Sequence, residues 1–318
     1  MMQPNEWLVL VNPVSGRGQA LRRQPEIARL LDAQGMRHRF AVSLFHEHAI
    51  DLVADAVRTG CRRVLVAGGD GSLNEALNGI LRQQEVPADR VLLATLPVGT
   101  GNDWARSHGV PRDWPAAVAL AARGHSALHD VGAADFDGGT RRWFLNVAGL
   151  GFDAAVVERK MARGFGPLAY MLGLLGALWS YRPVSVRISH DGAAPRNARI
   201  LVLFAALGRH CGGGMLIAPR AMADDGLFDS VLVHAMSRLE VLANLRKLFD
   251  GTLPEHPKVD TAPCGTLRIE AQAMLGVEAD GELVGHTPVT FRVVPHAVRV
   301  VIPEPSQQSG AGPGAPAA

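Results

Sequence analysis

The chain has 318 residues, of which 47% are hydrophobic and 19% are charged, and its formal net charge is +2. At this length about two domains are expected, which excludes a small disulfide-stapled scaffold, and the nearly balanced charge argues against a nucleic-acid binder. Cys61, Cys211 and Cys264 are odd in number and far apart, so they predict neither a disulfide framework nor a zinc site. Because residues 1–6 carry no basic patch leading into an apolar run, we expect a protein of the reducing cytoplasm.

The first third of the chain alternates predicted strands with predicted helices. Strands are expected at residues 7–11, 39–44, 64–67 and 91–96, and helices at residues 18–34, 47–58 and 73–81, with a short helix after residue 102. Strands that alternate with helices in this way indicate βαβ units and a parallel sheet covered on both faces. The predicted first domain is therefore an α/β domain over residues 1–130.

After about Asp130 the pattern changes to short strands separated by Gly and Asp-Gly turns, which indicates antiparallel structure. Strands are expected at residues 143–148, 184–190, 199–205, 226–234, 266–271, 289–293 and 298–302, with a helix over 237–249. The predicted second domain is a mostly antiparallel β-sandwich over residues 131–302, and its last strands are left free to return to the first domain. The tail, residues 303–318, is rich in Gly, Pro, Ser and Ala and is expected to be disordered.

One apolar segment reaches the lower limit for a membrane span, because no charged residue occurs from Gly164 to Tyr181. Pro167 shortens the possible helix to about 22 Å at 1.5 Å per residue, against a hydrocarbon core of about 30 Å, so we expect no transmembrane helix. Two interpretations of Pro167 to Tyr181 stay open. The segment is either a core helix or, because cations flank it on both sides, a docking surface for anionic lipid.

A glycine-rich loop, Gly68 to Gly71, joins the buried strand 64–67 to the next helix. Such a loop offers backbone N–H groups and a helix N-terminus to an anion, although it has neither the Walker A nor the dinucleotide-binding spacing. Ser72 and Glu75 also have the spacing of a capping box. Capping does not explain why three glycines surround Asp70, and the sequence offers no structural partner for this carboxylate. A phosphate site is therefore predicted.

A second loop of the same design, residues 96–103, follows the next strand and contains Gly99, Thr100 and Gly101. Ligands of open α/β sheets bind beyond the carboxyl ends of the strands, so two adjacent glycine loops there suit a nucleotide triphosphate. The loop after the first strand, residues 12–18, is a third candidate. Its Arg17 could contact phosphate, and a plain turn is the alternative.

Two acidic turns of the second half are also candidates. Asp224, Asp225 and Asp229 surround Gly226, and this pattern suits either a hard cation with oxygen ligands or a solvated turn. Further on, Asp280-Gly281 between residues typical of strands predicts a tight hairpin turn. This turn does not account for Glu282, which follows it.

Together these motifs resemble the diacylglycerol kinase catalytic domain family, soluble bacterial lipid kinases related to sphingosine and ceramide kinases. The resemblance rests on VNPVSGRG at 11–18, GGDGSLNE at 68–75, LPVGTGND at 96–103, GLGFDA at 149–154, APRAMADDGLFD at 218–229 and DGE at 280–282. GGDG alone also fits NAD kinases and phosphofructokinases, whereas LPVGTGND together with the ADDG block is specific. The resemblance implies an NAD kinase/diacylglycerol kinase-like fold with ATP held between the two domains. Ser72 stands where the family usually has threonine.

The resemblance also implies roles for individual residues. The ATP site would comprise Ser43, Gly69, Asp70, Gly71, Ser72, Asn74, Glu75 and Thr100. Asp70 would act in catalysis by binding Mg²⁺, and Glu282 would be the general base. A structural Mg²⁺ would be held by the carboxylate of Asp225 and the carbonyls of Met222 and Leu227.

The function predicted from these observations is ATP- and Mg²⁺-dependent transfer of the γ-phosphoryl group to a hydroxyl of a diacylglycerol-like lipid, as in phospholipid biosynthesis. The protein would act peripherally at the inner face of the membrane, and a homodimer is left open. Two alternatives remain. One is an NAD kinase-like enzyme with a soluble acceptor, and the other is a nucleotide- and lipid-binding protein without turnover.

Overall fold

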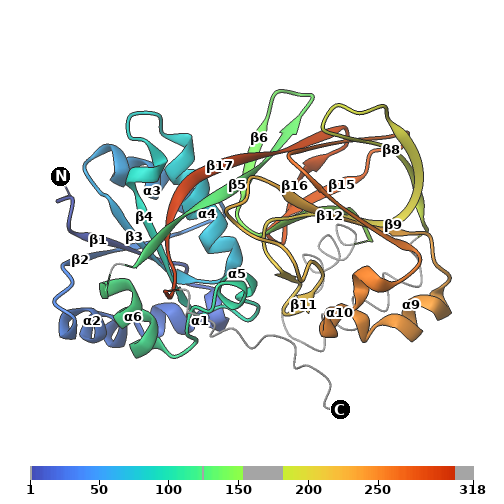
Figure 1. Cartoon of the computed structure of the whole chain (residues 1–318). Helices are drawn as coiled ribbons and strands as arrows, with labels where there is room; N and C mark the ends of the chain where they lie inside the picture. The colour runs from blue at the N-terminus through green and yellow to red at the C-terminus, as the bar shows by residue number, and fades with distance from the viewer. Residues whose placement is uncertain (1, 124, 153–181, 305–318) are drawn as a thin grey trace, which may run out of the picture.

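The computed structural model describes residues 2–123, 125–152 and 182–304 (Figure 1). The segment Pro167 to Tyr181 and the tail from residue 305 onward lie outside the described residues, so the interpretations given for them stay predictions. Figure 1 shows two halves side by side, with helices around the N-terminal half and mostly strands in the C-terminal half.

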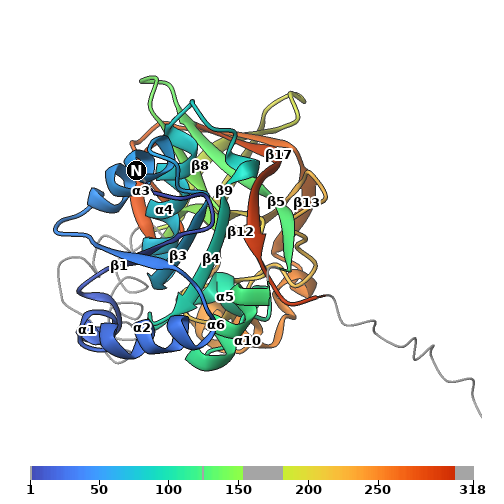
Figure 2. The same cartoon turned by 90° about the vertical axis from the view of Figure 1, so that its left-hand side faces the viewer.

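The N-terminal half is built on a parallel sheet in the order β2, β1, β3, β4. Its strands are β1 (Trp7–Val11), β2 (His38–Val42), β3 (Arg63–Gly68) and β4 (Leu92–Pro97). Its helices are α1 (Ser15–Arg22), α2 (Gln24–Ala33), α3 (His48–Arg58), α4 (Asp70–Arg82), the short η1 (Ala88–Arg90), α5 (Asp103–Ser107) and α6 (Trp114–Arg123). In both views, α3 and α4 cover one face of the sheet and α1, α2 and α6 cover the other (Figures 1 and 2). The predicted parallel α/β arrangement is confirmed.

The C-terminal half is mostly antiparallel, as predicted. Its strands are β5 (Ser126–Phe136), β6 (Arg141–Phe144), β7 (Val147–Gly151), β8 (Val184–His190), β9 (Arg196–Ala206), β10 (His210–Cys211), β11 (Met215–Leu216), β12 (Phe228–His234), β13 (Val259–Cys264), β14 (Thr266–Ala271), β15 (Gly276–Ala279), β16 (Glu282–His286) and β17 (Val289–Val301). Its helices are α9 (Arg238–Asn244), α10 (Lys247–Asp250) and the short η2 (Leu253–Glu255).

The strand β17 connects the two halves. It pairs antiparallel with β5 and β14, and its end pairs parallel with β4 at Arg299 and Val300. Two separate strands, 289–293 and 298–302, were predicted here. They form one strand with a register shift between Val294 and Val298, because Pro295 and the left-handed His296 (φ 51°) interrupt the pairing without ending it.

Three other predicted elements have different boundaries. The predicted helix 18–34 is wrong as a single element, because the chain leaves the helical conformation at Arg23, between α1 and α2, and Gly18 has a left-handed φ of 83°. The predicted strand 143–148 is two strands, β6 and β7. The predicted helix 237–249 is likewise two helices, α9 and α10.

The helix after the first glycine loop begins earlier than predicted, at Asp70, with Gly69 as its N-cap. Ser72 therefore lies inside the helix, so it cannot cap the N-terminus, and the alternative of a capping box at Ser72 and Glu75 is wrong. The structure has a capping box in α9 instead, where Ser237 and Glu240 hydrogen bond to each other's backbone N–H groups.

The core divides between the two halves of the fold. One cluster packs between the parallel sheet and its helices and includes Trp7 and Leu77. The antiparallel half contains two further clusters, and in one of them the rings of Phe144 and Phe228 stack with centroids 5.7 Å apart and Phe291 meets Phe144 edge-on. Each half thus has its own buried apolar centre, which fixes the loops that lie between them.

Candidate active site at the glycine loops

The register of the parallel sheet brings three loops to one edge. Val11 of β1 pairs with Ala67 of β3, and Gly68 at the end of β3 pairs with Pro97 of β4. The loops that follow these strands therefore start side by side, at the carboxyl ends where open α/β sheets bind ligands.

The two predicted phosphate loops are in backbone contact. The N–H groups of Val98 and Gly99 donate to the carbonyl of Gly68 at 2.9 and 3.2 Å. A Cβ on Gly99 would lie 2.6 Å from the Cα of Gly69, and a Cβ on Gly69 would lie 3.2 Å from the Cα of Gly99. Glycine is needed at both positions, because any side chain would push the loops apart.

Asp70 has a structural partner that the sequence did not reveal. Its Oδ2 accepts a hydrogen bond from the N–H of Asp103, and its Oδ1 accepts one from the N–H of Trp104, both at 3.1 Å. These are the first two N–H groups of α5, which have no acceptor within the helix. The expectation that nothing competes for this carboxylate is therefore wrong, because Asp70 ties the first glycine loop to the second.

Asp103 is a site residue that the sequence analysis missed, although it ends the LPVGTGND motif. Its Oδ2 accepts a hydrogen bond from the N–H of Gly213 at 2.7 Å, a contact from the C-terminal half. Its Oδ1 is buried and has no hydrogen-bond partner among the residues that the structure describes. Burial, helped by the negative charge of Asp70, raises the pKa of Asp103 to about 6.

The third loop, residues 12–18, closes over the other two. Asn12 Nδ2 donates to Ser72 Oγ at 3.1 Å, and Ser15 Oγ lies 3.5 Å from the same oxygen. A Cβ on Gly16 would lie 2.5 Å from the carbonyl oxygen of Val98, so this loop also contacts the second glycine loop. The structure thus brings Ser72 together with the first and third loops, while Gly16 joins the third loop to the second.

Asn74 and Glu75 on α4 point to neighbouring chain segments. Asn74 Nδ2 donates to the carbonyl of Trp143 at 2.8 Å and to Asp280 Oδ2 at 2.9 Å. Glu75 Oε1 accepts a hydrogen bond from the N–H of Glu47 at 3.0 Å. Asn74 therefore links α4 to the C-terminal half, a role that its place in the motif did not indicate.

The two outermost members of the predicted ATP site differ in exposure. Ser43 directly follows β2, is buried, and its N–H donates to the carbonyl of Val11 at 3.0 Å. Thr100 is exposed at the tip of the second glycine loop. Both belong to the edge of the sheet where the glycine loops lie.

The predicted hairpin turn at Asp280-Gly281 is confirmed. Ala279 pairs with Glu282 across a two-residue loop, and Asp280 and Gly281 have φ of 51° and 86°, as a tight primed turn requires. The Asp280 carboxylate accepts hydrogen bonds from the N–H groups of Leu145, Asn146 and Val147 and from the side chain of Asn74. Burial raises the pKa of Asp280 to about 6, although the hydrogen bonds from these four donors lower it.

Glu282 lies over the first turn of α4. Its Oε1 would be 2.9 Å from a Cβ on Gly71, and its Oε2 accepts a weak hydrogen bond from Arg142 Nη2 at 3.5 Å. Burial, followed by the negative charge of Glu75, raises the pKa of Glu282 to about 7, while His46 and Arg142 oppose this shift. A carboxylate with this pKa is suited to accept a proton near neutral pH.

The predicted structural metal site is an acidic turn at the surface. Asp225 Oδ1 accepts a hydrogen bond from the N–H of Leu227 at 3.1 Å, and Met222 is exposed. Within the described ranges, no group of three or more His, Cys, Asp or Glu residues is arranged to hold a metal ion. The predicted set has one carboxylate and two carbonyls, so its donors still match the oxygen ligands of a hard cation.

The sequence analysis missed Asp130 beneath this turn. Asp130 is fully buried, and its Oδ2 accepts a hydrogen bond from the N–H of Gly226 at 2.7 Å. Its Oδ1 accepts one from the N–H of His296 at 2.8 Å. This carboxylate fixes the backbone of the acidic turn to β5 and β17.

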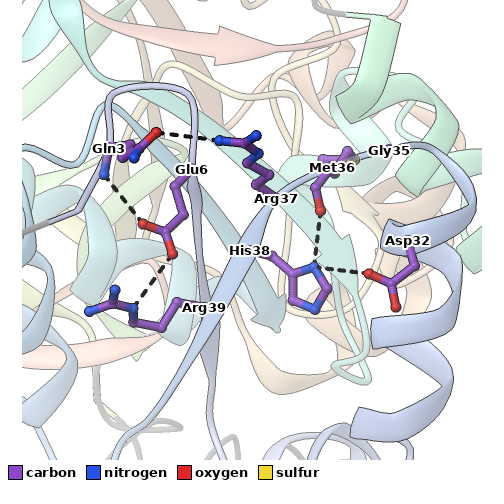
Figure 3. Close-up of a pocket in the computed structure, with 8 residues that line it drawn as sticks. All are labelled: Gln3, Glu6, Asp32, Gly35, Met36, Arg37, His38 and Arg39. Atoms are coloured by element: carbon purple, nitrogen blue, oxygen red, sulfur yellow. Dashed lines mark hydrogen bonds and ion pairs between the residues drawn. The ribbon is translucent and has the colours of Figure 1, made fainter.

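A surface pocket of about 610 Å³ lies away from these loops (Figure 3). It is lined by Gln3, Glu6, Asp32, Gly35, Met36, Arg37, His38 and Arg39. These residues lie before or at the start of β1 and β2, so the pocket is at the opposite end of the strands from the glycine loops. Figure 3 shows that its polar groups pair with one another, as Arg39 does with Glu6 and His38 with Asp32.

The apolar segment that was weighed as a membrane span lies outside the described residues, so the expectation about it is not tested. All three cysteines are buried, and none of them is in a disulfide bond. Across the three described ranges, we find no helix with the length and apolar character needed to cross a membrane.

Comparisons with known proteins agree with the motifs. The model of the diacylglycerol kinase catalytic domain matches residues 6–134, and that of the YegS C-terminal NAD kinase beta sandwich-like domain matches residues 146–302. The chain is 33% identical over 297 residues to the diacylglycerol kinase of Mycobacterium tuberculosis, with 92% of this chain and 94% of that protein covered.

Solved structures show the same fold. The crystal structure of a diacylglycerol kinase from Bacillus anthracis is similar with a TM-score of 0.72 and 22% identity, covering 96% of this chain and 99% of that one. An NAD kinase from Archaeoglobus fulgidus, solved in complex with ATP, has a TM-score of 0.51 and 11% identity, with 94% of each chain covered. The resemblance seen in the motifs is confirmed, and the chain belongs to the diacylglycerol kinase family of lipid kinases.

Proposed function

We propose that this protein transfers the γ-phosphoryl group of ATP to a hydroxyl of a diacylglycerol-like lipid at the inner surface of the membrane. The observation that carries the proposal is the position of Glu282, whose Oε1 lies against Gly71 in the glycine loop. A proton acceptor and an anion-binding loop thus meet at one point, although they come from opposite halves of the chain. The relative named diacylglycerol kinase in Mycobacterium tuberculosis supports this acceptor class.

The residues present fit a nucleotide. Gly69 and Gly99 let the two glycine loops meet without side chains between them, so the start of α4 and the second loop lie side by side as one candidate anion-binding edge. The exposed Thr100 and the buried Ser43 would extend this contact surface along the sheet edge. Phosphoryl transfer requires mainly positioning and charge neutralisation, which such loops provide.

In the proposed reaction, the lipid hydroxyl oxygen attacks the γ-phosphorus. The bond from that phosphorus to the bridging oxygen of ADP breaks, and the hydroxyl proton passes to Glu282 Oε1. A Mg²⁺ ion bound with the nucleotide would neutralise phosphate charge. Asp70 would be its protein ligand, and Asp103 beside it already has a cation nearby, because Arg106 Nε lies 3.9 Å from Asp103 Oδ1.

We also propose a second, structural Mg²⁺ at the acidic turn, held by the Asp225 carboxylate and the carbonyls of Met222 and Leu227. The support for it is the turn itself, where Asp225 Oδ1 accepts a hydrogen bond from the N–H of Leu227. Burial and the negative charge of Asp225 also raise the pKa of Asp229, against the opposing charge of Arg220. Negative charge therefore accumulates at this turn, and a bound cation would relieve it.

The function is tested by incubating the protein and the Glu282→Gln variant with γ-³²P-ATP, Mg²⁺ and an extracted lipid mixture. We expect the label in an organic-phase product for the unaltered protein and a large loss for the variant. Label in a water-soluble product would favour an NAD kinase-like acceptor, and no transfer at all would favour a binding protein without turnover. Either of these results would contradict the proposal.

A further inference from the structure

Arg142 on β6 lies between two carboxylates that belong to different parts of the chain. Its Nη1 donates to Glu47 Oε1 at 2.7 Å, and its Nη2 donates to Glu282 Oε2 at 3.5 Å. Its side chain is only 15% exposed, against 55% for Glu47. Its Nε is buried without a hydrogen-bond partner among the described residues, so hydrogen bonds to protein hold only the outer end of the guanidinium.

The two oxygens of Glu282 have different surroundings. Oε2 faces the guanidinium, whereas Oε1 faces Gly71 and the glycine loop. A carboxylate held by one oxygen presents the other in a defined direction. We infer that Arg142 is a positioning residue that orients Glu282, so that Oε1 is the atom that receives the proton of the acceptor hydroxyl. This inference rests on the proposed function.

The charges around Glu282 show why a cation is needed there. Glu75 on α4 and Asp280 in the hairpin turn both disfavour the ionised form of Glu282. The opposing groups are first His46, an exposed side chain on the loop before α3, and then Arg142. Arg142 is thus the buried cation beside Glu282, and without it the carboxylate would bind a proton more tightly.

Glu47 competes with Glu282 for the same guanidinium, and its contact is the shorter of the two. This competition provides an internal control, because removing the charge of Glu47 and removing the charge of Arg142 should change the pKa of Glu282 in opposite directions. Loss of the Glu47 charge should leave Arg142 to act on Glu282 alone, which would favour the ionised form. Loss of the Arg142 charge should disfavour it.

The test measures kcat/KM against pH for Arg142→Gln, Arg142→Lys, Glu47→Gln and Glu282→Gln, with Mg²⁺-ATP and 1,2-dioctanoylglycerol in mixed micelles. The acidic limb of this profile reports the pKa of the base in the free enzyme. With Arg142→Gln we expect the limb to move to higher pH by about one unit, because an opposite charge within this distance shifts a pKa by about one to three units. Arg142→Lys should keep the limb near its normal position, and Glu47→Gln should move it to lower pH.

A structural role alone would lower the amount of folded protein without moving the limb, so the melting temperature is measured in parallel. If Glu282→Gln is inactive while Arg142→Gln keeps the normal limb, the positioning role is wrong and the proposed base stands. If Glu282→Gln keeps normal turnover, the proposed base and this inference both fail. Should Arg142→Gln not fold, Arg142→Lys and Glu47→Gln decide the matter, and an unshifted limb in Glu47→Gln overturns the inference.

Discussion

Glu282 and Gly71 come from opposite halves of the chain, yet a Cβ on Gly71 would lie 2.9 Å from Glu282 Oε1. Real Cβ atoms essentially never approach another atom so closely, so an alanine at position 71 would displace the carboxylate. Gly71 lies in α4 without a left-handed φ, so alanine is compatible with its backbone. The glycine therefore leaves room for Glu282 rather than allowing a special turn.

We predict that Gly71→Ala lowers kcat with little loss of stability, because replacing glycine by alanine within a helix stabilises it by about 0.5–1 kcal/mol. Gly79→Ala is the matched control in the same helix. Its Cβ would lie 2.6 Å from the carbonyl oxygen of Ile50, so it should lower the melting temperature instead. Turnover and thermal unfolding of both variants check this, and full turnover in Gly71→Ala would show that Glu282 is not held as described.

The raised pKa of Glu282 also has a consequence for stability. A carboxyl group with a folded pKa of about 7, above its ordinary value of 4.5, favours the folded state less as pH rises between these two values. Glu282→Gln removes this penalty, so it should stabilise the protein at pH 8 by about 1–3 kcal/mol and leave it unchanged at pH 4.

Thermal unfolding of both proteins at the two pH values provides the measurement. The same variant should lose about 10²- to 10⁴-fold in turnover at pH 8, the usual contribution of a positioned base. A gain in stability at pH 8 that comes with a loss of turnover is the expected signature. If the two proteins have equal melting temperatures at pH 8 as well as at pH 4, the pKa of Glu282 is not raised in the folded protein.

Much of the fold could be predicted from local sequence. The strands at Trp7–Val11 and Val184–His190 have their predicted bounds, because runs of apolar and β-branched residues between turns determine them locally. The glycine loops were also visible, since glycine is needed wherever backbones touch. The loop at residues 12–18 was predicted as well, but its left-handed conformation at residues 16–18 was not, because that conformation accompanies a contact with Val98, which is distant in the sequence.

The candidate site was predictable in its members but not in its contacts. Asn74 was assigned to ATP, yet it also binds the carboxylate of Asp280, 206 residues away in the chain. Asp103, Asp130 and Arg142 were missed for the same reason. Each acts through a partner distant in sequence, and one sequence carries no signal for such a pairing.

Asp70→Asn is expected to reduce both turnover and stability. Its carboxylate accepts hydrogen bonds from two backbone N–H groups at the start of α5. Loss of an acceptor that caps a helix lowers the free energy of unfolding by about 0.5–2 kcal/mol. An asparagine keeps one acceptor oxygen, so the cost should fall at the lower end of this range. Circular dichroism melts and ATP turnover test this, and an unchanged melting temperature would contradict the role of Asp70 in joining the loops.

Mg²⁺ should raise the melting temperature of the unaltered protein, because a ligand that binds only the folded state stabilises it by mass action. Asp225→Ala should lose most of this gain if the acidic turn holds the structural ion. Asp224→Ala is the matched control, since the neighbouring carboxylate is not in the predicted ligand set. Scanning fluorimetry without Mg²⁺ and with Mg²⁺ at about 100 times its Kd, where binding adds about 2.7 kcal/mol, compares the three proteins, and equal gains would exclude this site.

A buried histidine pair predicts acid lability. The rings of His108 and His129 lie 4.6 Å apart beside Trp104, and burial lowers the pKa of His108 to about 3 and that of His129 to about 4. Both folded values lie below the ordinary value of 6.5, so the unfolded chain binds protons that the folded protein does not. The contribution of the neutral pair to the free energy of unfolding is fully present above pH 6.5 and is lost as pH falls from 6.5 towards 4.

His108→Leu should weaken this dependence, because leucine fills the buried site without a proton to bind. Denaturant unfolding of both proteins at pH 7.5 and 4.5 measures it. We expect the difference between the two pH values to shrink by about 1–3 kcal/mol in the variant, since each unit of pKa shift corresponds to about 1.4 kcal/mol. His286→Leu, at an exposed histidine without a left-handed φ, serves as the control for loss of a histidine. An identical pH dependence in His108→Leu and the unaltered protein would show that the pair is protonated in the folded state.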